Sequence, residues 1–189
     1  MYVATLIANS KNRNLSELIL KQVVNDLGGV KYKVLDDNIA VDISLVSEPS
    51  NFEIVWKQLQ KHQIDIVIQP IKNRRKNILL ADMDSTMIEQ ECIDELADEA
   101  GVGKRVAEIT KRAMNGELDF EDALIERVKL LKGLSSDIIV NVLKGRITLM
   151  PGAESLIKTM KRNGSYCALV SGGFTDFTEA ISKMLGFDE

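Results

Sequence analysis

The chain has 189 residues, of which 45% are hydrophobic and 28% charged, so it can bury one large core or two small ones. Its net charge of -4 and isoelectric point near 5.2 argue against a nucleic-acid or anionic-membrane partner. No apolar run approaches the roughly 18 residues of a membrane span, and no basic leader opens the chain. Cys92 and Cys167 lack metal-ligand spacing and are expected to be free thiols in a reducing cytoplasm.

The first 72 residues predict a small α+β domain. Hydrophobic periodicity indicates strands at 2–8, 31–35, 39–45 and 64–68, with one helix after the first strand and one before the last. The second helix is expected to begin with a capping box from Ser50 to Glu53. The order βαββαβ implies a four-stranded antiparallel sheet with two helices on one face.

This order is similar to the small amino-acid-binding domains of the ACT type, which have a ferredoxin-like fold. The resemblance implies pairing between subunits, and hence a homodimer. No glycine-rich ligand loop follows the first strand, where the chain runs from Asn9 to Asn14, so a structural or dimerising role is favoured over effector binding. The basic stretch from Lys72 to Lys76 predicts a solvated linker between domains.

The stretch from Asn77 to Ile88 predicts a buried strand, covered on both faces, that ends in two carboxylates. Asp82 and Asp84 are expected to point into a crevice at the carboxyl end of this strand, with Met83 facing the core. One carboxylate can attack phosphorus and the other can carry protons, while Mg²⁺ neutralises the phosphate. The alternative is a solvated strand end with two acids, and the triplet alone does not decide between them.

After Asp84 the helical periodicity lasts for some sixty residues. It predicts four short helices within about 90–148, an inserted bundle suited to be a lid over the aspartates, with Asp119 capping the third helix. A second core strand at 166–170 then runs into Ser171-Gly172-Gly173-Phe174 before another helix. A hydroxyl and glycine N–H groups at a helix start can grip phosphate. The alternative is a tight turn that needs its glycines for packing.

Asp82-Met83-Asp84-Ser85-Thr86 and the Ser-Gly-Gly-Phe turn, on either side of a helical insert, resemble the haloacid dehalogenase-like phosphohydrolases and, among them, the phosphoserine phosphatases. The resemblance covers residues 78–187 and also rests on Glu91, Ala113-Met114-Asn115-Gly116, Asp119-Phe120 and Arg127-Val128. It implies an α/β fold class. An incomplete haloacid dehalogenase-like Rossmann core at 73–189, with an inserted helical cap, would follow the ACT-like domain at 1–72.

By this resemblance the chain belongs to an Mg²⁺-dependent enzyme. It would hydrolyse O-phospho-L-serine to L-serine and phosphate through an aspartyl-phosphate, the last step of serine biosynthesis. Asp82 is implied as the nucleophile and Asp84 as the acid/base, with the Asp82 carboxylate and the backbone carbonyl of Asp84 on Mg²⁺. Ser171 and Gly172 would hold the phosphate of the small-molecule substrate.

The resemblance also assigns the two ends of the amino acid. Glu91 would meet the substrate ammonium group and Arg127 its carboxylate, the latter by paired hydrogen bonds. Without the resemblance, both would be ordinary surface charges of helices. Met114 and Phe120 match apolar lid residues, and either shielding of the substrate or core packing would account for them.

The chain departs from this family after the second strand. Phosphoserine phosphatases continue through a phosphate-binding lysine and a Gly-Asp-Gly-x-x-Asp type turn that completes the Mg²⁺ site. The acids that follow Ser171 here, namely Asp176, Glu179, Asp188 and Glu189, do not form that motif. We therefore expect a piece of a longer enzyme, inactive as it stands, with an uncovered sheet edge and apolar face.

Two other functions remain open from the sequence. The aspartyl-phosphate could pass its phosphoryl group from phosphoserine to another alcohol instead of to water. Alternatively, the chain could be a noncatalytic amino-acid-sensing or dimerising module.

Overall fold

The computed structural model describes residues 1–189, and the chain divides into two compact units, Met1–Arg75 and Lys76–Glu189. Each unit has its own cluster of buried apolar side chains. No helix in the structure has both the length and the apolar character needed to cross a membrane. Both cysteines are free, as expected.

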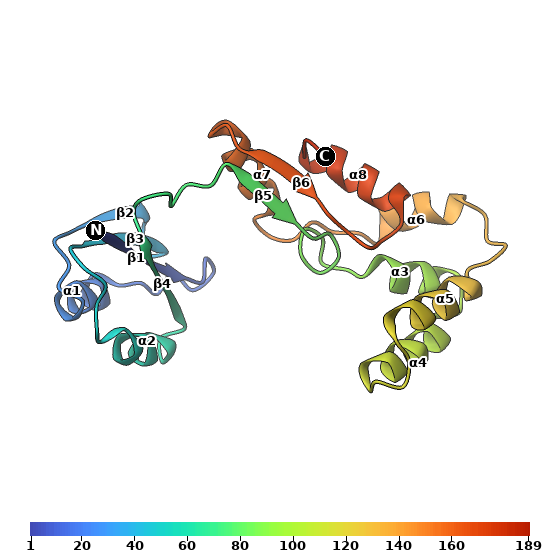
Figure 1. The fold of residues 1–189 in the computed structure, drawn as a ribbon, viewed down its shortest axis with the longest axis horizontal. Helices are drawn as coiled ribbons and strands as arrows, with labels where there is room; N and C mark the ends of the chain where they lie inside the picture. Colours follow the sequence, from blue (N-terminus) through green and yellow to red (C-terminus); the bar gives the residue numbers. More distant parts are fainter. The chain divides into compact units, whose positions relative to one another are not determined.

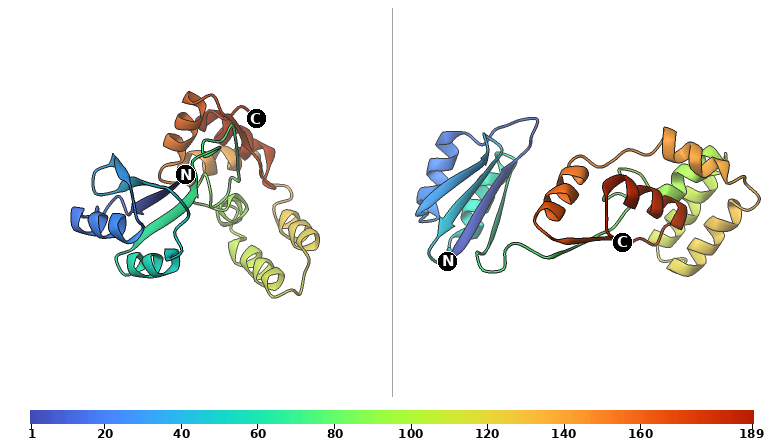
Figure 2. Two further views of the ribbon diagram at one scale, coloured as in Figure 1. Left: turned by 60° about the vertical axis from the view of Figure 1, so that its left-hand side comes forward. Right: turned by 90° about the horizontal axis from the view of Figure 1, so that it is seen from above.

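Unit 1 is a four-stranded antiparallel sheet with two helices on one face (Figures 1 and 2). Its elements are β1 (Tyr2–Ala8), α1 (Glu17–Asp26), β2 (Lys31–Asp36), β3 (Ala40–Leu45), α2 (Phe52–Gln60) and β4 (Ile64–Pro70). The strands lie in the order β2-β3-β1-β4, which confirms the predicted βαββαβ fold. On β3, Val41, Ile43 and Leu45 are buried against the helices, because alternate side chains of a strand face the same way.

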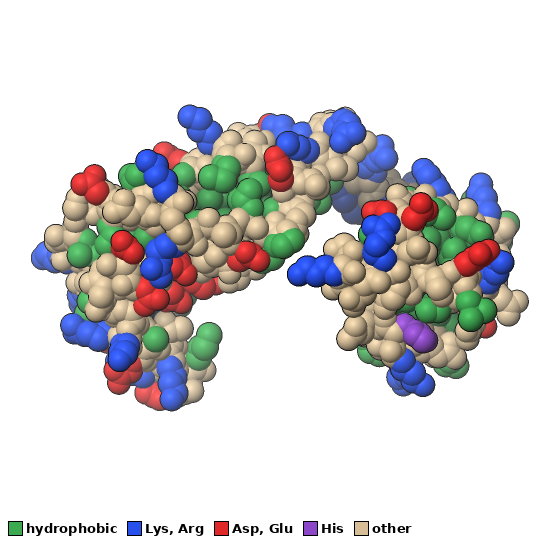
Figure 3. All heavy atoms as spheres, turned by 180° about the vertical axis from the view of Figure 1, so that it is seen from behind, with side chains coloured by type: hydrophobic (Ala, Val, Ile, Leu, Met, Phe, Trp, Pro, Cys, Tyr) green, Lys and Arg blue, Asp and Glu red, His purple; other side chains and the backbone are tan.

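The predicted capping box of α2 is wrong. Asn51 is the N-cap residue, and neither it nor Ser50 makes a side-chain capping bond. Instead, the Asn51 amide donates a 2.7 Å hydrogen bond to the carbonyl of Asp26, the last residue of α1. The polar side chain therefore joins two helices, a long-range partner that local sequence spacing does not reveal. His62, the one histidine, lies on the surface of this unit just after α2 (Figure 3, purple).

The predicted linker is also not uniformly solvated, because Arg74 binds back onto the sheet of unit 1. Its guanidinium donates to both carboxylate oxygens of Asp42, at 2.6 and 2.8 Å, and to the Thr5 hydroxyl at 2.9 Å. Thr5 also donates to Asp42 at 2.7 Å. Burial by itself would raise the pKa of Asp42, but the hydrogen bonds from Arg74 and Thr5 outweigh it and hold that pKa below its usual value.

We expect Arg74→Gln to destabilise unit 1 by about 1–2 kcal/mol at neutral pH, allowing for the partial exposure of the pair. A lowered folded-state pKa stabilises above the unfolded value, here 3.8, and this stabilisation is lost as the pH falls through the folded-state pKa. The loss caused by Arg74→Gln should therefore shrink in acid. Urea unfolding followed by the single tryptophan, Trp56 of α2, measures unit 1 alone. Equal losses for Arg74→Gln and for the exposed control Arg75→Gln would contradict this prediction.

Unit 2 is a two-stranded parallel sheet with helices and a helical insert (Figures 1 and 2). Its elements are β5 (Ile78–Ala81), α3 (Cys92–Glu99), α4 (Gly103–Met114), α5 (Phe120–Leu130), α6 (Asp137–Gly145), α7 (Ala153–Arg162), β6 (Tyr166–Leu169) and α8 (Thr175–Leu185). β5 pairs with β6 in parallel, although α3 to α6 and α7 separate them in sequence. The predicted incomplete α/β core with an inserted helical cap is thereby confirmed.

The sheet of unit 2 is covered on one face only. Leu79 and Ala81 face the apolar cluster that includes α7 and α8, whereas Ile78 and Leu80 are 61% and 68% exposed. The expectation that this strand is covered on both faces is therefore wrong. The expected uncovered apolar face is present. Met83 is fully buried in the cluster, as predicted, so it turns away from its two neighbouring aspartates.

Salt bridges join the last residue of the insert to its first helix. Arg146, which follows α6, pairs with three carboxylates of α3, those of Glu95, Asp98 and Glu99. Figure 3 shows acidic side chains gathered on this unit beside basic ones. The start and the end of the insert are thus joined by charge.

Candidate active site

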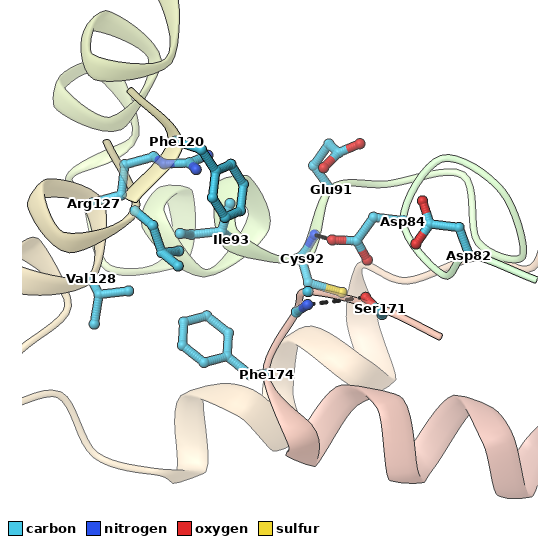
Figure 4. A pocket seen from close by; sticks show the side chains of 13 residues that line it. Asp82, Asp84, Glu91, Cys92, Ile93, Phe120, Arg127, Val128, Ser171 and Phe174 are labelled. Carbon is cyan, nitrogen blue, oxygen red and sulfur yellow. Dashed lines mark hydrogen bonds between the residues drawn. The ribbon is translucent and has the colours of Figure 1, made fainter. Parts of the chain in front are cut away.

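A cavity of about 480 Å³ in unit 2 collects every residue that the sequence proposed for the site (Figure 4). These residues are Asp82, Asp84, Glu91, Arg127, Ser171 and Gly172. The strand ends supply one side of the cavity and the helical insert supplies the other. In Figure 4, Arg127 and Phe120 lie across the cavity from the two aspartates.

The two aspartates have different surroundings. Asp82 is exposed where β5 ends, and its Oδ1 accepts a 2.8 Å hydrogen bond from the N–H of Met83. Asp84 is half-buried, and its Oδ2 accepts a 3.2 Å hydrogen bond from the N–H of Cys92, the first residue of α3. The other oxygen of Asp84, Oδ1, is buried and has no hydrogen-bond partner. An unpaired oxygen of this kind is available to a proton or a ligand.

Burial raises the pKa of Asp84 above its usual value. The hydrogen bonds from Cys92 oppose this rise, while the negative charges of Glu91 and Asp82 add to it. A carboxyl group with a raised pKa keeps its proton nearer to neutral pH, which suits a group that gives and takes protons.

A tight turn after Asp84 folds the chain back to the cavity. The N–H groups of Thr86, Met87 and Ile88 all point to the carbonyl of Met83, at 3.2, 2.8 and 3.1 Å. Ser85 has a φ of 52°, which is in the left-handed region where residues with a side chain are uncommon. Its hydroxyl donates a 2.7 Å hydrogen bond to Oε1 of Glu91. The strained turn therefore brings the Glu91 carboxylate beside the aspartates.

The Ser-Gly-Gly-Phe turn lies on the same side of the cavity as the aspartates. The Gly173 N–H donates a 3.0 Å hydrogen bond to the hydroxyl of Ser171. A Cβ at Gly173 would lie 3.1 Å from the Met83 side chain, so this glycine is explained by packing. At Gly172 an added Cβ would meet nothing within 4 Å, so packing does not account for that glycine. The packing alternative thus covers only one of the two glycines.

Arg127 reaches the cavity from α5 on the insert. Its Nε donates to the carbonyl of Ala123 at 3.3 Å, and its guanidinium forms no salt bridge with any carboxylate in the structure. The first turn of α5 is fixed by Asp119, whose side chain accepts from the N–H of Asp122 at 2.8 Å, as predicted. A guanidinium without a carboxylate partner, facing a cavity, is a site for an anionic group.

Met114 and Phe120, the two apolar insert residues matched to lid positions, do not belong to the core. Met114 is 84% exposed and Phe120 is 72% exposed, so core packing is wrong for both. Phe120 lines the cavity beside Arg127. Its ring can therefore shield part of the cavity from solvent.

Sequence reasoning missed Cys92 as a residue of the site. Its N–H holds Asp84, and burial raises the pKa of its thiol so that it stays protonated. The residue type gives no signal, because a single cysteine forms no motif. Its position directly after Glu91, at the start of a predicted helix, could have shown that its N–H points to the strand end.

The residues present suit Mg²⁺ in kind, although no three His, Cys, Asp or Glu side chains come together as a metal cluster. Mg²⁺ prefers oxygen ligands and is commonly held by one or two carboxylates together with substrate phosphate. Asp82 offers an exposed carboxylate at the end of β5, and the backbone carbonyl of Asp84, two residues further on, would be the second protein ligand.

Comparison with known proteins gives one consistent family. The haloacid dehalogenase-like hydrolase family matches residues 79–189. Phosphoserine phosphatase of Archaeoglobus fulgidus is 46% identical over 134 residues, which cover 70% of this chain and 39% of that protein. Phosphoserine phosphatase of Saccharomyces cerevisiae is 33% identical over 200 residues, covering 99% of this chain and 65% of that protein.

The fold comparison extends over both units. A haloacid dehalogenase family hydrolase from Salmonella enterica serovar Typhi superposes with a TM-score of 0.78 at 26% identity, covering 100% of this chain and 66% of that one. The chain thus spans 39% and 65% of the two phosphatases with which it was aligned. With the family matched over more than half of the chain, this protein belongs to the haloacid dehalogenase-like hydrolases and is a homologue of the phosphoserine phosphatases.

Proposed function

We propose that this chain carries the nucleophile, the acid/base and the substrate-recognition residues of a phosphoserine phosphatase. One observation carries the proposal. A single cavity holds the two strand-end carboxylates, the Glu91 carboxylate beside them and the unpaired guanidinium of Arg127 across from them. Glu91 and Arg127 are opposite in charge to the ammonium and carboxylate groups of an amino acid phosphate.

In the proposed reaction, the free oxygen of Asp82 attacks phosphorus and the bond between phosphorus and the serine oxygen breaks. Asp84 gives its proton to the leaving serine oxygen. It then takes a proton from the water that attacks phosphorus and releases Asp82. When bound by Asp82 and the backbone carbonyl of Asp84, Mg²⁺ would neutralise negative charge on the phosphate.

Recognition of the substrate uses the remaining residues of the cavity. The Ser171 hydroxyl and the backbone N–H of Gly172 hold the phosphate. The Glu91 carboxylate, already held by Ser85, meets the ammonium group. The guanidinium of Arg127 binds the carboxylate of the amino acid, and the ring of Phe120 limits access of water.

We expect residues 1–189 by themselves to show no turnover of O-phosphoserine and only weak Mg²⁺ binding. One carboxylate and one carbonyl leave Mg²⁺ largely hydrated, and a lysine that would neutralise the phosphate is not among the cavity residues. Phosphate-release assays and Mg²⁺ calorimetry on this chain test the prediction. Robust turnover by residues 1–189 would refute it.

The function itself is tested on an extended protein, in which residues 1–189 continue through a lysine and a Gly-Asp turn of the family type. This extended protein should hydrolyse O-phosphoserine in the presence of Mg²⁺ and lose that activity with a chelator. If it hydrolyses other phosphate esters equally well, the proposed recognition by Glu91 and Arg127 is wrong.

A further inference from the structure

The helical insert is joined to the strand ends by two segments that pair with each other. Residues 85–91 lead into α3, and residues 146–150 return from α6. Ile88 and Leu149 form an isolated antiparallel bridge, and the Met150 N–H donates to the Met87 carbonyl at 3.0 Å. Every motion of the insert relative to the strands must pass through these two segments.

Side-chain hydrogen bonds add to these backbone contacts, and they centre on Gln90 and Thr148. The N–H of Thr148 donates to Oε1 of Gln90 at 2.8 Å, and Nε2 of Gln90 donates to the Thr148 hydroxyl at 2.8 Å. The same hydroxyl donates to a carboxylate oxygen of Glu89, whose N–H donates to the Thr148 carbonyl at 3.0 Å. All polar groups of Thr148 are thus engaged by two consecutive residues of the outgoing segment.

The outgoing segment is bonded just as closely to the site. The Gln90 carbonyl accepts from the N–H of Ser85 at 3.1 Å. The next residue, Glu91, accepts from the Ser85 hydroxyl at 2.7 Å, and Cys92 donates its N–H to Asp84 at 3.2 Å. Gln90 is therefore the point where the turn that carries Asp84 meets the segment returning from the insert.

We propose that Gln90 and Thr148 form a hinge clasp, and that Gln90 is a positioning residue that fixes the helical insert over the cavity. The insert supplies Arg127 and Phe120, while the strand ends supply Asp82 and Ser171. The distance between these two halves decides whether both ends of one small substrate can be held together. Opening the clasp frees the insert without removing any residue that touches the cavity.

The clasp predicts a local opening that two buried cysteines can report. Cys92 lies at the base of α3, beside the junction, and is 1% exposed, whereas Cys167 lies in β6 and is fully buried. Release of the insert uncovers Cys92 but leaves the strand pair intact. Alkylation of Cys92 should then accelerate while alkylation of Cys167 does not.

The test measures the alkylation rate of each cysteine in residues 1–189 by peptide mass spectrometry. Gln90→Met keeps the length of the side chain and removes both amide hydrogen bonds. Two solvent-exposed hydrogen bonds, each at the weak end of the usual range, correspond to an increase of about fivefold in the Cys92 rate. Thr148→Val should give a similar increase, whereas Thr148→Ser, which keeps the hydroxyl, should behave as the parent. Thr159→Val, at an exposed threonine of α7, is the matched control.

Three results would overturn the clasp. An unchanged Cys92 rate in Gln90→Met and Thr148→Val would show that the pair does not hold the insert. Equal acceleration of Cys92 and Cys167 would show a general loss of stability. Acceleration in Thr148→Ser as large as in Thr148→Val would exclude the hydroxyl as the cause.

The effect of the clasp on substrate binding rests on the proposed phosphatase function, but the cysteine-labelling experiment does not. In the extended protein, Gln90→Met should raise KM for O-phosphoserine about fivefold with little change in kcat, because both halves of the cavity are still intact. If the extended protein lacks activity, the proposed function fails while the clasp is still judged by the cysteine rates. A fall in kcat with unchanged KM would contradict the positioning role.

Discussion

Asp82→Asn should reduce phosphate release by the extended protein to the background rate. An amide is a poor nucleophile towards phosphorus and a weaker ligand for Mg²⁺ than a carboxylate, so both the attack and the charge neutralisation suffer. The structure indicates that the fold will survive this change. The oxygen that accepts from the Met83 N–H at 2.8 Å is retained in asparagine, and the side chain is otherwise exposed.

The matched control is Asp176→Asn, at an exposed carboxylate in the first turn of α8. It removes the same charge from the same unit without touching the cavity, and its activity should equal that of the parent. Single-turnover and steady-state phosphate release distinguish slow attack from slow release. Undiminished turnover in Asp82→Asn would rule out this residue as the nucleophile.

Arg127→Ala should lower kcat/KM for O-phosphoserine by about ten- to a hundredfold, the equivalent of a charge-assisted hydrogen-bonded pair of about 1.5–3 kcal/mol. Phosphoethanolamine keeps the phosphate and the ammonium group but lacks the carboxylate. Its kcat/KM should change little, because it never uses the guanidinium. In the structure this guanidinium makes one 3.3 Å hydrogen bond within its own helix, so its removal costs the fold little.

Lys129→Ala, an exposed cation on the same helix, controls for a general change in charge. It should affect both esters equally and slightly. If Arg127→Ala lowers kcat/KM for both esters by the same factor, Arg127 stabilises the insert and does not bind the substrate carboxylate.

The sequence predicted the structural features that depend on the local pattern of residues. Alternation on β3 identified its buried face, and the short side chain of Asp119 marked the start of α5. The site residues were found because their spacing matched a known family, and the fold brings them to one cavity. Their roles still rest on that resemblance and on the experiments above.

What the sequence could not predict depends on partners far along the chain. An apolar run such as Ile78 to Ala81 is the same whether one or both faces are covered, so the exposure of Leu80 was not visible in it. Arg74 lies in a basic stretch that has the composition of a linker, and only the fold brings Asp42 close enough to bind it. The clasp joins Gln90 and Thr148, which are separated in the sequence by the four helices α3 to α6.

At Ser85 the backbone conformation favours glycine, whereas the hydrogen bond to Glu91 needs a hydroxyl. Glycine would adopt its φ of 52° without steric cost, so a sequence selected for stability alone would favour glycine there. Glycine has no hydroxyl, however, and would release the carboxylate of Glu91 that Ser85 holds at 2.7 Å. Serine at this position thus exchanges folding stability for a fixed Glu91 carboxylate, the group that we propose binds the substrate ammonium. If Glu91 has the proposed role, laboratory selection for thermal stability should replace Ser85 by glycine and weaken the discrimination between phosphate esters.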